Sequence, residues 1–384
     1  AGPVAGTYKP LTEVEPRIAI NSVNTPGDAD SSFKITQPGS YYLTANITGS
    51  VGKHGIEIVA SGVTLDLNGF DLVGALGMGA FDGVHAGGTG LTGIAVTNGS
   101  IRGWGQDGIN LGDTGVAEAC RVDSVLAAGN ARVGIYGGVN SQLTRCSGTD
   151  GTYGLYVRSS SSLLDCSASG NSSDGITTDS GTTLSNCSSG NNAGAGFTLF
   201  PGCTASNCAA YGNTGSGINT SSAATLTNCV TYQNTGNGID AFTGSTISHC
   251  TSYDNSGHGI TVSTGCTVID STTRSNTLDG IHCGSISVIR GNACTSNGSG
   301  GDGAGINATG TDNRIEGNTC ASADRGIDVD ASGNIIIRNV CAGNLTNWVI
   351  VANNVVGPIL DRTAPASAAI NGNVAPSSLG TTDP

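Results

Sequence analysis

A repeat of 21 residues runs through the middle of the sequence. Its most regular mark is a glycine followed by an apolar residue, at Gly175-Ile176, Gly196-Phe197, Gly217-Ile218, Gly238-Ile239, Gly259-Ile260 and Gly280-Ile281. An asparagine stands four residues before each of these glycines, and a cysteine stands nine residues before most of them. A fixed period of about 20 residues, with short β-branched runs between turn residues, predicts a solenoid.

The composition agrees with an all-β chain and limits the partners. Glycine contributes 62 of 384 residues and charged residues only 11%, so the residues that favour helices are scarce. The net charge of −13 argues against nucleic acid and against anionic membrane surfaces as partners. No run approaches the roughly 18 apolar residues of a membrane span. Because the sequence begins at Ala1 without a methionine or an apolar signal core, we expect a mature secreted protein, extracellular or at the cell surface.

The 13 cysteines follow the repeat period, which makes a disulfide framework improbable. Residues one period apart lie in adjacent coils about 4.8 Å apart, farther than the roughly 3.8 Å Cβ separation of a disulfide. We expect stacked free thiols that fill the core. The sequence contains no Cys-x-x-Cys pair that would indicate zinc binding.

The sequence divides into three regions. Residues 1–54 lack the period and contain a strand, turn, strand pattern from Phe33 to Ile47, which predicts a cap over the open end of the solenoid. Residues 55–349 form the solenoid of about 13 coils, with irregular spacing in the early coils. Residues 350–384 are rich in Ala, Ser, Asn and Pro and predict an extended tail that is held by the protein itself or by another copy.

Each coil has room for three short strands and three bends. In the coil that follows Asn213, the strands are Gly217–Thr220, Thr225–Cys229 and Val230–Tyr232. We therefore expect three parallel sheets, with the asparagines stacked at one bend and bonded to one another through their amides. Tyr211, Tyr232 and Tyr253 share the period and predict an aromatic stack, which protects the sheet or offers a platform for sugars.

These glycine, Thr-Leu-x-x-Cys and asparagine ladders resemble the repeats of right-handed parallel β-helix proteins over about residues 55–350. The group includes pectate lyases, polygalacturonases, phage tailspikes and exported bacterial proteins, and the exported bacterial proteins are the most similar over Pro38–Gly74. The resemblance implies a single right-handed parallel β-helix. The resemblance does not indicate an activity, because proteins with this fold include both enzymes and non-catalytic structural proteins.

In β-helix enzymes the substrate usually lies on the outer face of the first strand of each coil. One candidate catalytic group on this face consists of Asp240, His258, Asp279 and His282, from successive coils. A carboxylate and an imidazole about 4.8 Å apart are suited to general acid–base catalysis. Gly257-His258-Gly259 also resembles a polygalacturonase motif, but the other carboxylates of that family are missing. A variable surface residue is the alternative interpretation of His258.

A second candidate group, for binding a ligand, combines aromatic and cationic side chains. Its members are Tyr136, Tyr156, Arg158 and Arg132, a mixture that is typical of sugar sites. No cofactor is expected. Calcium at Asp324, Asp328 and Asp330 is a weak alternative to solvated surface carboxylates.

Two functional hypotheses remain open. Regular ladders leave few distinctive polar groups, which favours an extracellular structural or adhesive protein that self-associates. The alternative is a polysaccharide-active enzyme, a lyase or glycoside hydrolase, or a glycan-binding module that uses one of the two groups above.

Overall fold

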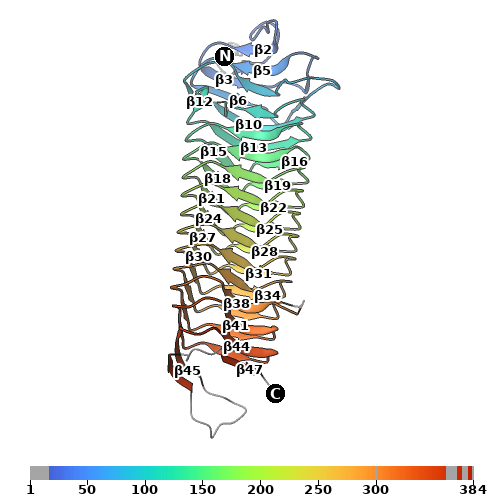
Figure 1. Ribbon diagram of the computed structural model, residues 1–384. Helices are drawn as coiled ribbons and strands as arrows, with labels where there is room; N and C mark the ends of the chain where they lie inside the picture. The colour runs from blue at the N-terminus through green and yellow to red at the C-terminus, as the bar shows by residue number, and fades with distance from the viewer. Residues whose placement is uncertain (1–16, 114, 299–300, 360–369, 374–378, 383–384) are drawn as a thin grey trace, which may run out of the picture. The chain divides into compact units, whose positions relative to one another are not determined.

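The computed structural model describes residues 17–113, 115–298, 301–359, 370–373 and 379–382, and it separates into two compact units. The first unit runs to Gly151 and the second begins at Thr152. Both are built from short parallel strands stacked coil upon coil (Figure 1). The expected all-β right-handed parallel β-helix is therefore confirmed. The described residues contain no helix of the length and apolar character needed to cross a membrane.

In the first unit, three ladders of strands run from coil to coil. The first ladder comprises β2 (Ser31–Ile35), β5 (His54–Ile58), β8 (Val84–Ala86), β11 (Ile109–Asn110) and β14 (Val133–Gly137). The second comprises β3 (Gly39–Tyr42), β6 (Val63–Asp66) and β15 (Gln142–Thr144), and the third β4 (Ile47–Thr48), β7 (Asp71–Val73) and β16 (Ser147–Thr149). Two long strands, β10 (Ala95–Arg102) and β13 (Arg121–Ala128), belong to both of these ladders. The short strands β1 (Ile18–Ala19), β9 (Leu91–Thr92) and β12 (Ala117–Glu118) complete the unit.

The predicted cap is part of this ladder system. Strand β2 already pairs in parallel with β5, in the register Phe33↔Ile56, and β3 pairs in parallel with β6. The boundary expected at residue 55 therefore falls inside β5.

The second unit repeats the same three ladders with greater regularity. The first contains β17 (Tyr153–Val157), β20 (Ile176–Thr178), β23 (Phe197–Leu199), β26 (Ile218–Thr220), β29 (Ile239–Ala241), β32 (Ile260–Val262), β35 (Ile281–Cys283), β38 (Ala304–Ala308), β41 (Arg325–Val329) and β44 (Thr346–Ile350). The second contains β18 (Ser162–Leu164), β21 (Thr183–Ser185), β24 (Thr204–Ser206), β27 (Thr225–Thr227), β30 (Thr246–Ser248), β33 (Thr267–Ile269), β36 (Val288–Arg290), β39 (Arg314–Glu316), β42 (Ile335–Ile337) and β45 (Val355–Ile359). The third contains β19 (Ser167–Ser169), β22 (Ser188–Gly190), β25 (Ala209–Tyr211), β28 (Val230–Tyr232), β31 (Thr251–Tyr253), β34 (Thr272–Arg274), β37 (Ala293–Thr295), β40 (Thr319–Ala321) and β43 (Val340–Ala342).

The end of the chain contributes two antiparallel strands. Strand β46 (Ile370–Asn373) pairs with β45, and β47 (Leu379–Thr382) pairs with β44. With β47 included, 16 strands occupy the position of the first ladder across the described residues, compared with the about 13 coils expected.

The repeated glycine is required because neighbouring coils approach closely. A Cβ atom at Gly259 would lie 2.6 Å from the carbonyl oxygen of Gly280 in the next coil. The apolar residue after each glycine points inward, and Ile218, Ile239, Ile260 and Ile281 are all fully buried. The cysteines are free, as expected; twelve are buried and Cys341 is half-buried.

The asparagine ladder forms as predicted. Asn234 Nδ2 donates to Asn255 Oδ1 at 2.9 Å, and the backbone N–H of Asn234 donates to the same oxygen at 3.1 Å. The residue before each of these asparagines, such as Gln233 or Asp254, has a left-handed backbone conformation. The ladder asparagines are buried and hold the coils together from inside.

Candidate functional site

The outer face of the first ladder in the second unit carries the group His258, Asp279 and His282, which we call the second-unit triad. His258 and Asp279 each stand directly before the repeat glycine of their coil, and His282 lies in β35. His282 and Asp279 are three residues apart, on either side of Gly280 and Ile281, while His258 comes from the preceding coil. The repeat therefore places two imidazoles around one carboxylate.

The three side chains are in direct contact. His282 Nδ1 lies 3.1 Å from Asp279 Oδ2, and His258 Nδ1 lies 3.2 Å from the same oxygen. The backbone N–H of Asp279 donates to His258 Nδ1 at 3.2 Å. The two rings are 4.6 Å apart between centroids and tilted by 35°. The Asp279 side chain is 6% exposed, whereas the histidine side chains are 22% and 29% exposed, so the rings lie between the carboxylate and solvent.

Asp279 is held as a charged group. Burial alone would raise the pKa of its carboxyl, but the adjacent His258 and His282 side chains and the hydrogen bond from the Ala304 amide overcome this and lower the pKa to about 2. Asp279 is therefore ionised at neutral pH.

These contacts set different tautomers for the two neutral rings. His282 donates its Nδ1–H to Asp279, which leaves Nε2 as an unprotonated base. His258 accepts the Asp279 amide N–H at Nδ1, so its proton is on Nε2. In the neutral rings, Nε2 of His282 is thus a proton acceptor and Nε2 of His258 is a hydrogen-bond donor.

A local rule of the fold explains why Asp279 is placed so firmly. The residue before the repeat glycine faces the same residue of the next coil, and an Asp or Asn there accepts the backbone N–H of that neighbour. Asp279 Oδ1 accepts from Ala304 at 2.7 Å, and Asn237 Oδ1 accepts from His258 at 2.9 Å. This hydrogen bond, which we call the rung bond, fixes Oδ1 and leaves Oδ2 for the histidines.

The surroundings of the triad add a shallow pocket and further acidic groups. His258, Leu278, Asp279 and Asp302 are among the residues that line the pocket. Asn307, the register neighbour of His282 in the next coil, has a buried Oδ1 with no hydrogen-bond partner among the described residues. A ligand that donates a hydrogen bond would satisfy this oxygen.

Asp240, the fourth member of the predicted catalytic group, does not join the triad. Its register neighbour is Thr261, which in turn pairs with His282. Its carboxylate accepts a hydrogen bond from Asn237 Nδ2 at 3.4 Å, and within the described residues it makes no hydrogen bond or ion pair with either histidine. Burial raises the pKa of Asp240, although Asn237 and His258 oppose the change.

The predicted ligand-binding group is divided between the units. In the first unit, the Arg132 guanidinium lies over the Tyr136 ring at 5.4 Å and pairs with Asp107. In the second, Asp179 receives the Tyr156 hydroxyl at 3.1 Å and the Arg158 guanidinium at 3.3 Å. All four side chains therefore already contact protein groups. The tyrosine stack is present as expected, with ring centroids 5.3 Å apart for Tyr211–Tyr232 and 5.2 Å for Tyr232–Tyr253.

Metal binding has weaker geometric support than proton transfer. The donor atoms of the triad lie within 4.8 Å of one another, as a metal site requires. However, Nδ1 of His258 and Nδ1 of His282 are already engaged by the Asp279 amide and carboxylate. At the weak calcium candidate, Asp328 pairs with Arg325 at 2.5 Å and Asp324 accepts the Gly301 amide at 2.8 Å.

Sequence reasoning missed three features of the site. The tautomers depend on the Asp279 amide and carboxylate, and the rung bond depends on Ala304 in the next coil. The unpartnered oxygen of Asn307 is visible only in the structure. The signal that was available is the repeated position before each glycine, occupied by Asp174, Asn237, His258 and Asp279 in different coils.

Comparison with known proteins agrees on the fold. A family model described as right handed beta helix region matches residues 82–230 and 201–278. The tailspike protein of E. coli bacteriophage HK620, solved with a pentasaccharide, is 14% identical with a TM-score of 0.53, over 85% of this chain and 76% of that one. The siphovirus 9NA tailspike receptor binding domain is 13% identical with a TM-score of 0.52, over 84% and 73%. The A-module of the Azotobacter vinelandii mannuronan C-5 epimerase AlgE4 is 16% identical with a TM-score of 0.40, over 83% and 89%. No curated protein matches the sequence significantly.

Proposed function

The chain belongs to the family of right-handed β-helix proteins, and we propose that it uses this fold to bind a polysaccharide and to hydrolyse a bond in it by acid–base catalysis. The observation that carries the proposal is the pair of tautomers at the second-unit triad. One imidazole is arranged to accept a proton and the other to donate one, beside a carboxylate that stays ionised.

Each residue has a defined role in this mechanism. His282 Nε2 takes a proton from a water molecule as that water attacks the substrate, and Asp279 stabilises the imidazolium that forms. His258, in its protonated form, gives its Nε2 proton to the leaving oxygen. One proton enters the triad and one leaves it, so the charge of the triad is unchanged over the reaction. Asp279 acts on the two rings as a positioning residue and does not attack the substrate, because its Oδ1 and Oδ2 are both occupied.

The charges around the triad favour a substrate without a dense row of carboxylates. Asp302 lines the pocket, and the protein carries a net charge of −13. A polyanion would be repelled at the surface and overall. A neutral polysaccharide, or one substituted with neutral ester groups, fits these charges better.

This proposal follows the enzymatic alternative of the sequence analysis and not the self-associating rod favoured there. A pentasaccharide bound to the HK620 tailspike is compatible with a sugar ligand on a β-helix fold, although the argument rests on the triad itself. The coil surface around the triad offers hydrogen-bonding side chains such as Thr261 and Asn307, whose buried oxygens have no partner among the described residues.

The test is a screen of neutral, ester-substituted and uronate-rich polysaccharides for new reducing ends and for released acid. We expect turnover on at least one neutral or ester-substituted polymer, and a fall in turnover for His282→Gln, because the rate at the second-unit triad itself falls by about 10²- to 10⁴-fold. His249→Gln is the matched control, because His249 is an exposed histidine outside the triad. Absence of turnover over the whole panel, or full activity in His282→Gln, would overturn the proposal.

A further inference from the structure

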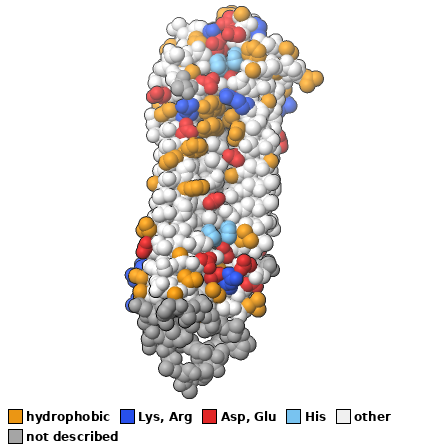
Figure 2. All heavy atoms as spheres, viewed as in Figure 1, with side chains coloured by type: hydrophobic (Ala, Val, Ile, Leu, Met, Phe, Trp, Pro, Cys, Tyr) orange, Lys and Arg blue, Asp and Glu red, His pale blue; other side chains and the backbone are white. Residues whose placement is uncertain are grey.

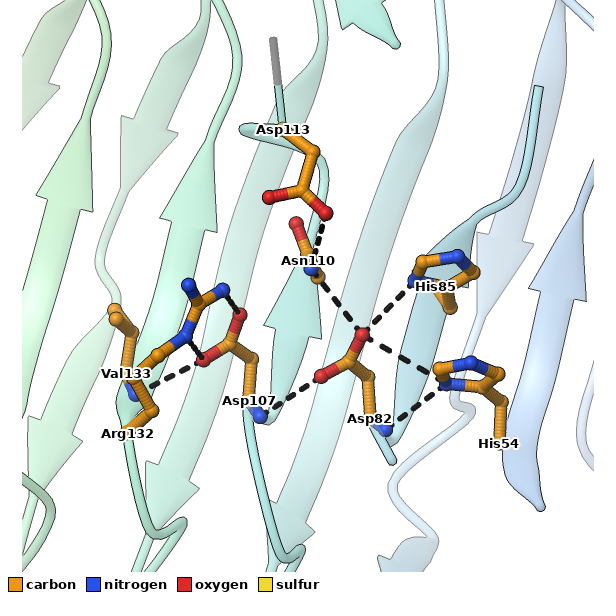
Figure 3. Close-up of polar contacts among 8 residues, drawn as sticks. All are labelled: His54, Asp82, His85, Asp107, Asn110, Asp113, Arg132 and Val133. Carbon is orange, nitrogen blue, oxygen red and sulfur yellow. Dashed lines mark hydrogen bonds and ion pairs between the residues drawn. The ribbon is translucent and has the colours of Figure 1, made fainter. Parts of the chain in front are cut away.

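The first unit contains an arrangement of the same kind, formed by His54, Asp82 and His85, which we call the first-unit triad (Figure 3). His85 Nδ1 lies 2.9 Å from Asp82 Oδ2. The backbone N–H of Asp82 donates to His54 Nδ1 at 3.0 Å, and Asp82 Oδ1 accepts the backbone N–H of Asp107 at 2.9 Å. These are the contacts of the second-unit triad, atom for atom.

The correspondence extends along the sequence. Asp82, His85 and Asn110 are followed 197 residues later by Asp279, His282 and Asn307. His54 and His258 both precede the repeat glycine of the coil before the aspartate. Asn110, like Asn307, is the register neighbour of the second histidine and has a buried Oδ1 without a partner among the described residues. Four side chains, from three successive coils, therefore recur in the same positions.

A purely structural role does not account for the histidines. The rung bond needs only an Asp or Asn, as Asp107 and Asp174 show by accepting from Val133 at 3.0 Å and from Ala195 at 2.8 Å. Asp174 makes this bond in a coil where the flanking outward positions hold Thr177 and Thr198, not histidines. The imidazoles of His54 and His85 are 14% and 22% exposed, so they remain reachable from solvent.

The surroundings of the first-unit triad shift the pKa values of its two imidazoles in opposite directions. Burial and the neighbouring His85 lower the pKa of His54. Burial also opposes a charge on His85, but the hydrogen bond and charge of Asp82, with Glu57 and Asp113, raise its pKa. Glu57 is the register neighbour of His85 and pairs with Lys34, and Asn110 Nδ2 bridges Asp82 and Asp113 at 3.2 and 3.0 Å. The rings are stacked at 4.0 Å with an angle of 11°.

Figure 3 shows the second nitrogen of each imidazole on the side away from Asp82. Figure 2 shows histidine side chains at the surface in two patches, each beside acidic side chains. His54 accepts at Nδ1 and so carries its proton on Nε2, whereas His85 faces Asp82 through Nδ1. The contacts of the two Nδ1 atoms are thus those of the second unit.

We propose that the first-unit triad is a second catalytic site of the same kind, in which His54 and His85 act on a neutral or ester-substituted polysaccharide and Asn110 Oδ1 accepts a hydrogen bond from a sugar hydroxyl. His85 corresponds in position to His282, and His54 corresponds in position to His258. The chain therefore carries two sites, one in each unit. This inference rests on the proposed function for the reaction class, and on the recurrence of the second-unit contacts in the first unit for the position of the site.

The experiment compares the turnover of the full chain with three variants, His85→Gln, His282→Gln and the double variant, with His249→Gln as control. If the sites work independently, each single variant retains about half of the wild-type kcat and the double variant retains almost none. Wild-type turnover in His85→Gln, with none in His282→Gln, would overturn the second site and leave the proposed function intact. No turnover in the wild type would instead contradict the proposed function.

A substrate-independent measurement keeps the inference testable in that case. Nitrogen NMR of the imidazoles distinguishes a ring protonated at Nδ1 from one protonated at Nε2. We expect His54 and His258 to give the Nε2–H form at high pH, and His85 and His282 the Nδ1–H form. Identical tautomers at His54 and His85 would overturn the proposed second site. Circular dichroism of each variant verifies that the fold is retained.

Discussion

Asp279 Oδ1 accepts the backbone N–H of Ala304 at 2.7 Å, while Oδ2 of the same carboxylate faces His258 and His282. One side chain therefore performs two tasks. Oδ1 joins successive coils, and Oδ2 accepts the His282 Nδ1–H and so sets the tautomer of that ring. The two tasks can be separated by mutation, because only the second requires a carboxylate.

Asp279→Asn should retain the rung bond but lose the carboxylate oxygen that accepts the His282 Nδ1–H. An asparagine accepts the next amide as well as an aspartate does, as Asn237 does for His258 at 2.9 Å. The new Nδ2 group cannot accept the His282 Nδ1–H, so His282 changes to the Nε2–H form and ceases to be a base. In a His85→Gln background, which isolates the second-unit triad, we expect a fall in kcat of about 10²- to 10⁴-fold with native circular dichroism. Unchanged kcat would contradict the role of Asp279 as a positioning residue.

The stability of the protein should depend on pH through the same carboxylate. The pKa of Asp279 is lowered from 3.8 to about 2 in the folded state. The stabilisation is therefore complete above the unfolded pKa and is lost as the pH falls through about 2. A shift of this size corresponds to about 2 kcal/mol in the free energy of unfolding.

Urea unfolding of the wild type and of Asp279→Asn from neutral to acidic pH measures this contribution. We expect the wild type to be more stable by about 2 kcal/mol near neutral pH, and the difference to vanish at about pH 2. A difference that does not change with pH would show that the charge of Asp279 contributes nothing to stability. His249→Gln controls for histidine protonation outside the triad.

Interrupting the asparagine ladder should destabilise the second unit strongly. Asn234 Oδ1 accepts from both the backbone N–H and Nδ2 of Asn213, at 3.1 and 2.9 Å, and Asn234 is fully buried. Asn234→Ala leaves these two buried donors without an acceptor, at a cost of about 1–3 kcal/mol each. We expect a loss of about 3 kcal/mol or more in urea unfolding.

The matched control for this change is Thr243→Ala. Thr243 is exposed, and its hydroxyl lies 3.3 Å from that of the half-buried Ser263. We expect an effect within about 0.5 kcal/mol, as for most surface substitutions. Equal losses from Asn234→Ala and Thr243→Ala would contradict the structural importance of the ladder.

The fold was predictable from the sequence because each coil repeats the same physical constraints. Gly259 must lack a side chain, Ile260 must be apolar and Asn255 must bond to its neighbours, so these residue types recur at one spacing. The regular spacing also brought His258 and Asp279 together on one face. The coil count was harder to predict, because early coils differ in length and a glycine interval of 28 residues separates Gly55 from Gly83.

The same irregularity explains why the first-unit triad was missed. His54 and Asp82 are 28 residues apart, whereas His258 and Asp279 are 21 apart, so the first pair does not follow the regular period. Asp240 was included in the catalytic group because it shares the outward position, but hydrogen bonds, which the spacing does not determine, join the triad without it.

The state of the cysteines provides a last prediction. All 13 are free and, with the exception of the half-buried Cys341, they are buried among the coils. A buried thiol reacts slowly because reagent cannot reach it and burial disfavours the thiolate. We expect at most one thiol to react rapidly with a disulfide reagent in the native protein, and all 13 in denaturant without reductant. Cys341→Ser should abolish the rapid reaction. Recovery of 11 thiols or fewer in denaturant would reveal a disulfide and would contradict the stacked arrangement of free cysteines.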